Sequence, residues 1–235
     1  MQALARGLYP AQCLLCSERV EQDFALCGAC WAGMGFLSGL ACRDCGAPLP
    51  GTSNRDELCD ECLAEPRPWE GGVAVLPYQD AARRFVLALK HGDRTDLARA
   101  AGGWMASKAH RWITPDTLVV PVPLHWLRLW RRRYNQSELM ARALAHDAEV
   151  ELCPDLLIRP RRTPVLDGKG REERAEVLRS AIAPHPRRSA EGRPVLIVDD
   201  VMTTGATLSA ATQAAFDAGA SRVSIAVLAR VAKDV

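Results

Sequence analysis

Apolar segments alternate with amphipathic segments along most of the chain, starting near residue 73. Two of the apolar runs, residues 118–122 and 195–198, carry no charge, which is typical of strands covered on both faces of a parallel sheet. The alternation predicts βαβ units and therefore an α/β domain built on a parallel sheet with flanking helices. We expect strands at residues 73–77, 118–122, 156–159, 195–198 and 223–228, and helices at residues 81–90, 95–111, 137–148 and 207–218.

The first part of the chain lacks this alternation and is rich in cysteine and small residues. Residues 65–72 then bring two prolines and two glycines, a composition that favours a boundary between domains. We therefore predict a small domain at residues 1–66 and an α/β domain at residues 73–235.

Eight of the nine cysteines form four Cys-x-x-Cys pairs within the small domain. A structural Zn²⁺ needs four thiolate or imidazole ligands in a tetrahedron, and one such pair delivers two of them. Disulfides would need an oxidising compartment, and we find no export signal in the sequence. The pattern predicts two structural zinc sites with no open position for catalysis. The expected ligands are Cys13, Cys16, Cys27, Cys30, Cys42, Cys45, Cys59 and Cys62.

The spacing of the four pairs favours a sequential arrangement, first with second and third with fourth, because short connections close the loops. An interleaved pairing remains open. The apolar residues that follow the pairs opened by Cys27 and Cys59 suit helix starts, whereas Gly46 suits a knuckle that lies close to another backbone. Such a small domain, with few large apolar side chains, should depend on metal for much of its folding free energy.

A candidate phosphate site lies at residues 195–207, VLIVDDVMTTGAT. An apolar strand runs into two carboxylates, and a Thr/Gly turn then leads into a helix, whose N-terminus attracts phosphate. The carboxylates suit the hydroxyls of a ribose, and through Mg²⁺ they can help to hold a pyrophosphate. The segment therefore predicts a sugar-phosphate site, and its residues are Asp199, Asp200, Thr203, Thr204, Gly205, Ala206 and Thr207.

Two other interpretations of this segment are weaker. An apolar strand that ends in Asp-Asp is also found in P-loop NTPases, but the single Gly-Lys step, Gly168-Lys169, is followed by Gly170 and not by Ser or Thr. A purely structural strand end with capping threonines leaves the combination of two acids and three threonines unexplained.

The segment VLIVDDVMTTGAT resembles the signature of type I phosphoribosyltransferases that binds 5-phosphoribosyl-1-pyrophosphate (PRPP). The whole chain resembles the ComF family of competence-associated proteins, in which a double zinc ribbon precedes a phosphoribosyltransferase domain. Further motifs that carry the resemblance are LKHGD at residues 89–93, VPVPLH at 120–125 and YNQ at 134–136. The resemblance implies PRPP with Mg²⁺ as ligand, with Asp199 and Asp200 as the catalytic carboxylates on the ribose.

Two functions are compatible with this resemblance. One is transfer of the 5-phosphoribosyl group to an acceptor by displacement at C1 of PRPP. The other is a PRPP-responsive module without catalysis that handles single-stranded DNA in natural transformation, with the ribbons contacting DNA or a competence protein. The sequence contains no recognisable acceptor motif.

The resemblance also implies that the loop after residues 118–122 meets the pyrophosphate, where arginines and Mg²⁺ would stabilise the developing charge. The residues concerned are Pro123, Leu124, His125, Arg128, Asn135 and Gln136. The arginines beside Trp126 and Trp130 are equally consistent with a solvated helix face. Residues 159–174 are basic and rich in turn residues, so we expect a loop there, and the resemblance implies that this loop closes as a lid over PRPP.

The overall charge and hydropathy narrow these functions further. A formal net charge of +2 argues against a general polyanion binder. No run of about 18 uncharged apolar residues is present, so we expect no membrane span and a cytoplasmic protein.

Overall fold

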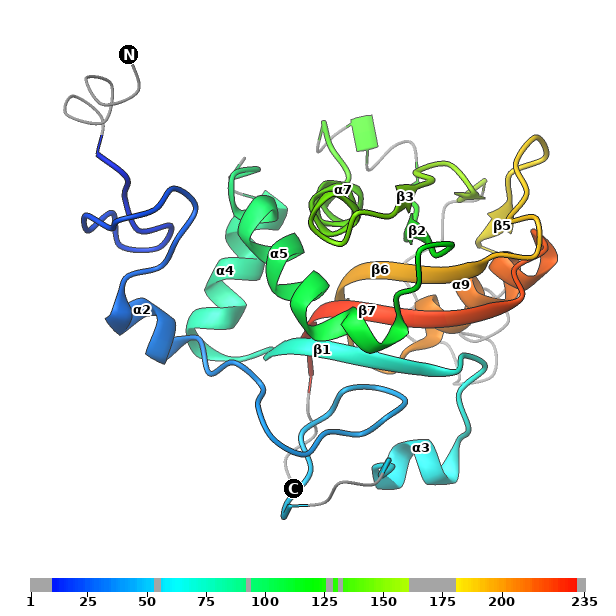
Figure 1. Cartoon of the computed structure of the whole chain (residues 1–235), viewed down its shortest axis with the longest axis horizontal. Coiled ribbons are helices and arrows are strands. Elements are labelled where there is room, and N and C mark those ends of the chain that lie inside the picture. The colour runs from blue at the N-terminus through cyan, green and yellow to red at the C-terminus, as the bar shows by residue number, and fades with distance from the viewer. Residues whose placement is uncertain are drawn as a thin grey trace, which may run out of the picture.

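The computed structural model describes residues 10–52, 56–91, 94–125, 129–130, 133–160 and 181–231. Their centre is a five-stranded sheet in the order β1-β7-β6-β2-β3, and every neighbouring pair is parallel (Figure 1). The strands are β1 (Gly71–Pro77), β2 (Leu118–Pro121), β3 (Glu151–Leu152), β6 (Pro194–Met202) and β7 (Arg222–Arg230). The predicted parallel α/β sheet is therefore confirmed.

Helices cover both faces of this sheet. Three helices, α4 (Asp80–His91), α5 (Leu97–Ala109) and α7 (Gln136–Asp147), pack on one face, and α9 (Ala206–Asp217) packs on the other (Figure 1). Successive side chains of β6 alternate between the two cores: Leu196 and Val198 belong to the first, and Val195 and Ile197 belong to the second. This two-sided burial explains why the run is apolar throughout.

The structure corrects two predictions about strands. Residues 156–159 do not form a strand of the main sheet, because β4 (Leu157–Ile158) pairs antiparallel with β5 (Ala183–Pro184) in a separate two-stranded sheet. The edge of the main sheet is instead β3, which the sequence does not reveal because only two residues pair and Glu151 is exposed. The strand predicted at 195–198 continues through both aspartates to Met202.

The predicted helices are present with small shifts at their ends. The helix predicted at 95–111 divides into α5 and a 3₁₀ turn, η1 (His110–Trp112). In the cysteine-rich part, α2 (Gly28–Gly33) and α3 (Asp60–Ala64) begin directly after Cys27 and Cys59, as predicted. None of the described helices has the length and apolar character that crossing a membrane requires.

The cysteine-rich part packs against the α/β domain. Leu14 and Met34 join the core on the side of α4 and α5. The knuckle at Gly46 lies against β1: a Cβ on this glycine would sit 2.3 Å from the Ala74 nitrogen, and its φ is +70°. The close backbone approach expected at Gly46 is therefore confirmed, and the Gly72 amide also donates to the Arg43 carbonyl at 2.8 Å.

Candidate functional site

The eight predicted zinc ligands form two groups. Cys13, Cys16, Cys27 and Cys30 make the first zinc site, and Cys42, Cys45, Cys59 and Cys62 make the second; within each group the Sγ atoms lie within 4.8 Å of one another. The Sγ atoms of Cys16 and Cys27, and those of Cys45 and Cys59, are 3.6 Å apart. Zn–S bonds of about 2.3 Å in a tetrahedron give S···S distances of about 3.8 Å. The sulfur atoms therefore fit Zn²⁺, and the sequential pairing is confirmed.

The phosphate loop, residues 203–205, connects β6 with α9. Gly205 has a φ of +85°, which turns the chain into the helix that begins at Ala206. A cavity of about 110 Å³ is lined by Asp199 and residues 201–208. It is smaller than the ~300–1,000 Å³ pockets that hold drug-sized ligands. Its size and its position at a helix N-terminus suit one phosphate group.

Two neighbouring carboxylates lie on β6, and the first of them, Asp199, lines this cavity. Asp199 Oδ1 accepts hydrogen bonds from Ser137 Oγ and from the Asp200 amide, both at 2.9 Å. Asp200 Oδ1 forms an ion pair with Lys90 Nζ at 2.9 Å. Burial, together with the neighbouring charge of Asp200, raises the pKa of Asp199 to about 7. Asp199 therefore changes protonation state close to neutral pH.

Residues 134–137 connect the separate motifs of the site. Tyr134 Oη donates to the Leu89 carbonyl at 2.9 Å, and Gln136 Nε2 donates to the Lys90 carbonyl at 3.3 Å. Asn135 Nδ2 donates to the Val122 carbonyl at 3.1 Å, and Asn135 also caps α7 by accepting from the Ser137 amide. With Ser137 on Asp199, this segment fixes the LKH and VPVPLH motifs around the carboxylates.

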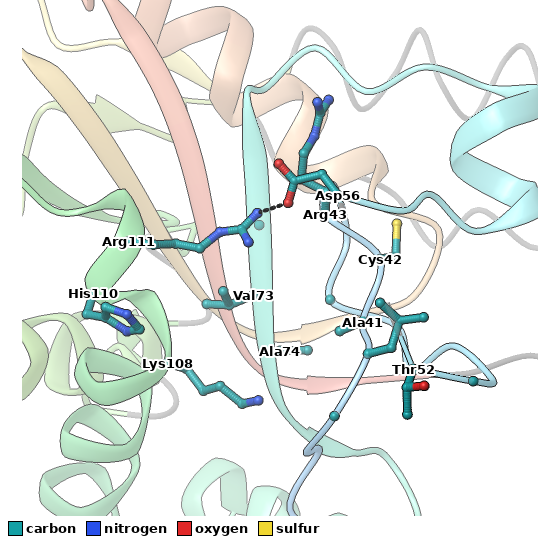
Figure 2. A pocket seen from close by; sticks show the side chains of 15 residues that line it. Ala41, Cys42, Arg43, Thr52, Asp56, Val73, Ala74, Lys108, His110 and Arg111 are labelled. Atoms are coloured by element: carbon teal, nitrogen blue, oxygen red, sulfur yellow. Dashed lines mark hydrogen bonds and ion pairs between the residues drawn. The ribbon is translucent and has the colours of Figure 1, made fainter. Parts of the chain in front are cut away.

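A larger cavity, of about 510 Å³, lies between the second zinc ribbon and α5. Figure 2 shows Lys108 and Arg111 on its α5 side and Arg43 and Asp56 on its ribbon side. Arg111 is paired with Asp56 at 3.2 Å (Figure 2), and Arg43 is paired with Asp44 at 2.9 Å. The two carboxylates of the phosphate site do not line this cavity, so it is separate from that site.

Comparison with known proteins finds two domain families in the chain. Residues 4–68 match the double zinc ribbon domain, and residues 113–235 match the phosphoribosyl transferase domain. The DNA utilization protein YhgH of Salmonella typhi is 30% identical over 224 residues, covering 93% of this chain and 89% of that protein. The chain belongs to the ComF family.

Two more distant relatives of this ComF protein carry competence names. Competence protein F of Haemophilus influenzae is 25% identical over 196 residues, covering 80% of this chain and 84% of that protein. Competence protein ComFC of Bacillus subtilis is 24% identical over 240 residues, covering 91% of this chain and 92% of that protein. The similarity thus extends over at least four fifths of the chain in both relatives.

The residues predicted to meet pyrophosphate lie in different environments in the ComF protein. Pro123 and His125 are buried after β2, and Leu124 is partly buried. Asn135 and Gln136 are buried and donate to backbone carbonyls, which gives them a positioning role; contact with pyrophosphate stays a prediction. Arg128 and most of the predicted lid, residues 161–174, lie outside the described residues.

Several site residues of the ComF protein escaped sequence reasoning. Ser137 was not predicted as a site residue. Its position directly after Asn135, which caps α7, and Gln136 could have indicated it. Lys90, near the C-terminal end of α4, forms an ion pair with Asp200. Arg67 and Arg230 donate to carbonyls of the phosphate loop, and no local sequence pattern predicts these two contacts.

Replacing Gly205 with alanine is expected to weaken, at least about tenfold, the PRPP binding that the sequence predicts, with a loss of about 1–2 kcal/mol in stability. The reason is twofold: the φ of +85° disfavours a side chain, and the new Cβ would lie 2.8 Å from Met202 Cε. Calorimetric titration with Mg-PRPP measures the effect. Gly219→Ala, at a φ of +90° beyond the other end of α9, is the control that should lose stability but keep affinity.

Proposed function

We propose that this ComF protein binds Mg-PRPP at the phosphate loop and transfers its 5-phosphoribosyl group to an acceptor. The observation that carries the proposal is the placement of Asp199 and Asp200 directly before a phosphate-sized cavity at the N-terminus of α9. The 5-phosphate would lie in the cavity, and the carboxylates would accept hydrogen bonds from the ribose hydroxyls. This arrangement matches the two ends of one ligand, a phosphate and a sugar.

The proposed reaction is a displacement at C1 of PRPP. A lone pair on the acceptor forms a bond to C1 while the bond from C1 to the pyrophosphate oxygen breaks, and the acceptor then loses a proton. Mg²⁺ would neutralise charge on the leaving pyrophosphate. Lys90 holds Asp200 in place by its ion pair, and Ser137 holds Asp199 by its hydrogen bond. Zinc sites made of thiolates need reduced cysteines, so we also propose that the protein is located in the cytoplasm.

A Mg-PRPP titration of the wild type and of Asp200→Asn tests the binding step. We expect the variant to bind at least about tenfold more weakly, because it loses the charge that orients the ribose and attracts Mg²⁺. Asp217→Asn, at the exposed far end of α9, is the matched control and should bind like the wild type. An unchanged isotherm for Asp200→Asn would remove the proposed site.

Pyrophosphate release tests the transfer step on the same preparation. Mg-PRPP is offered with a panel of bases and amines, and product is followed with a coupled phosphate assay. Release above background with one acceptor supports transfer. Background rates with every acceptor, from a protein that binds PRPP, count against transfer and favour a binding module.

A second candidate function is a PRPP-responsive module that handles single-stranded DNA through the zinc ribbons. Its support is the names of the relatives, which refer to DNA utilization and competence. Binding of a single-stranded oligonucleotide that weakens steeply with salt would favour it, because phosphate contacts release counterions. Absence of binding even at low salt would argue against it.

A further inference from the structure

The phosphate loop contacts the second zinc site through Arg67. The Arg67 side chain is 6% exposed, and its Nη1 donates to the Thr204 carbonyl at 3.0 Å. Its Nε donates to Cys62 Sγ at 3.4 Å. One rigid guanidinium therefore joins a zinc ligand to the loop that would hold the 5-phosphate.

A second arginine reaches the same loop from the end of β7. Arg230 is 4% exposed, and its Nη1 donates to the Thr203 carbonyl at 2.6 Å. Its Nη2 forms an ion pair at 2.7 Å with Glu61, which lies in α3 between the ligands Cys59 and Cys62. Glu61 also lies 4.0 Å from Arg67 Nη2. The knuckle of the second zinc site thus holds both arginines.

These contacts orient the amide groups of the loop. In a trans peptide the C=O and the following N–H point in opposite directions. Arginines that hold the Thr203 and Thr204 carbonyls therefore direct the amides of Thr204 and Gly205 away from the ribbon, as phosphate binding requires. A hydrogen bond to a carbonyl also polarises its peptide unit and strengthens the N–H as a donor.

We propose that the second zinc site controls PRPP affinity, with Arg67 and Arg230 as positioning residues that transmit its state to the phosphate loop. The inference rests on the proposed function, PRPP binding, and adds its regulation by zinc. When zinc leaves Cys59 and Cys62, α3 and Cys62 no longer fix the two guanidinium groups. The loop carbonyls are then released, and the phosphate loses oriented donors.

The first zinc site provides an internal comparison. In the described residues it joins the body of the protein elsewhere, on the side of α4 and α5, where Arg94 Nη2 donates to the Leu14 carbonyl at 3.0 Å. Arg94 resembles Arg67 in that each ties a zinc ribbon to the rest of the chain through a carbonyl. Of these two arginines, only Arg67 contacts the phosphate loop in the described residues, so Arg94→Gln is the matched control for Arg67→Gln.

Thermodynamic reciprocity supplies the test. If zinc at the second site strengthens PRPP binding, PRPP must strengthen zinc binding there by the same factor. We expect Mg-PRPP to raise the zinc affinity of the second site of the wild type at least about threefold, measured by equilibrium competition with a chromogenic chelator. Cysteine alkylation read by mass spectrometry assigns the lost zinc to one of the two sites. The zinc affinity of the first site should not change.

The variants distinguish this coupling from a merely structural role. Arg67→Gln should bind Mg-PRPP about tenfold more weakly and lose the protection of the second zinc site, whereas Arg94→Gln should keep both. Arg67→Lys, which retains a charged donor, should recover part of the affinity. Any direct extraction of zinc by PRPP would appear equally in all variants.

The outcomes separate this inference from the proposed function. A wild type that does not bind Mg-PRPP contradicts the proposed function and removes the basis of the coupling. A wild type that binds Mg-PRPP without any gain in the zinc affinity of the second site overturns the coupling alone. That comparison uses the wild-type chain, so it tests the coupling between zinc and PRPP even where Arg67→Gln fails to fold. Normal binding and normal zinc protection in a folded Arg67→Gln variant would also overturn it.

Discussion

Asparagine in place of Asp199 is expected to make the free protein more stable at pH 8 and to weaken Mg-PRPP binding at least about tenfold. The pKa of Asp199 is raised to about 7 by burial and by Asp200, compared with 3.8 for an unperturbed aspartate. A carboxyl group whose pKa is raised in the folded protein contributes its full stabilisation below pH 3.8, and this stabilisation is lost as the pH rises through about 7. Asparagine has no such loss, and its Oδ1 can still accept from Ser137 and the Asp200 amide.

The expected gain follows from the gap between the two pKa values. That gap corresponds to at most about 4 kcal/mol, and contact with solvent reduces it, so we expect about 1–2 kcal/mol at pH 8. The free energy of unfolding is measured with denaturant at pH 5 and pH 8. The advantage of Asp199→Asn over the wild type should be larger at pH 8, whereas Asp217→Asn should show no such trend. An equal loss of stability at both pH values would contradict this account.

The raised pKa of Asp199 also predicts that protons are released when Mg-PRPP binds. Ribose hydroxyls and Mg²⁺ favour the ionised form of Asp199, so wild-type protein should release protons when it binds Mg-PRPP near pH 7. Calorimetry in two buffers of different ionisation enthalpy measures that release. The Asp199→Asn variant lacks this carboxylate, so it measures the proton release that comes from PRPP itself. Asp199 would thus be a residue whose charge lowers the stability of the free protein but is required for binding the ligand.

The sequence predicted features that depend on local pattern. Uncharged apolar runs identified β2 and the buried part of β6, because strands covered on both faces tolerate no charge. The pairs of cysteines identified both zinc sites, because a tetrahedral metal site restricts ligand spacing. β3 could not be found in this way, because two residues, one of them exposed, form no pattern.

Contacts between distant parts of the chain could not be predicted. Arg67 and Thr204 are separated by 137 positions, and the acceptor is a backbone carbonyl that any residue could supply. Arg230 at the end of β7 reaches Thr203 only because β6 and β7 pair in parallel, which brings Met202 opposite Arg230. The cysteine spacing therefore predicts that zinc is bound, but only the fold shows what the zinc ribbon contacts.

The substitution Gly46→Ala is expected to cause the largest loss of stability of those considered, about 2–4 kcal/mol. The added Cβ would lie 2.3 Å from the Ala74 nitrogen and 2.8 Å from the Val73 carbonyl carbon, which are backbone atoms of β1 and cannot move aside easily because β1 is paired with β7. Gly39→Ala is the matched control: its φ of +82° is similar, and its Cβ would meet no atom within 4 Å. It should lose only about 1 kcal/mol.

Displacement of the second ribbon from β1 should also weaken PRPP binding. The Trp69 indole donates to the Asp44 carbonyl at 2.6 Å, and its ring lies near the Cα of Gly205, within 3.3 Å of where a Cβ would stand. Movement of the Gly46 knuckle would therefore shift Trp69, and with it the neighbouring Arg67, below the phosphate loop. Denaturant unfolding and Mg-PRPP titration should show both losses in Gly46→Ala, with two zinc ions still bound. Stability and affinity equal to those of Gly39→Ala would show that the ribbon adjusts its position without disturbing the loop.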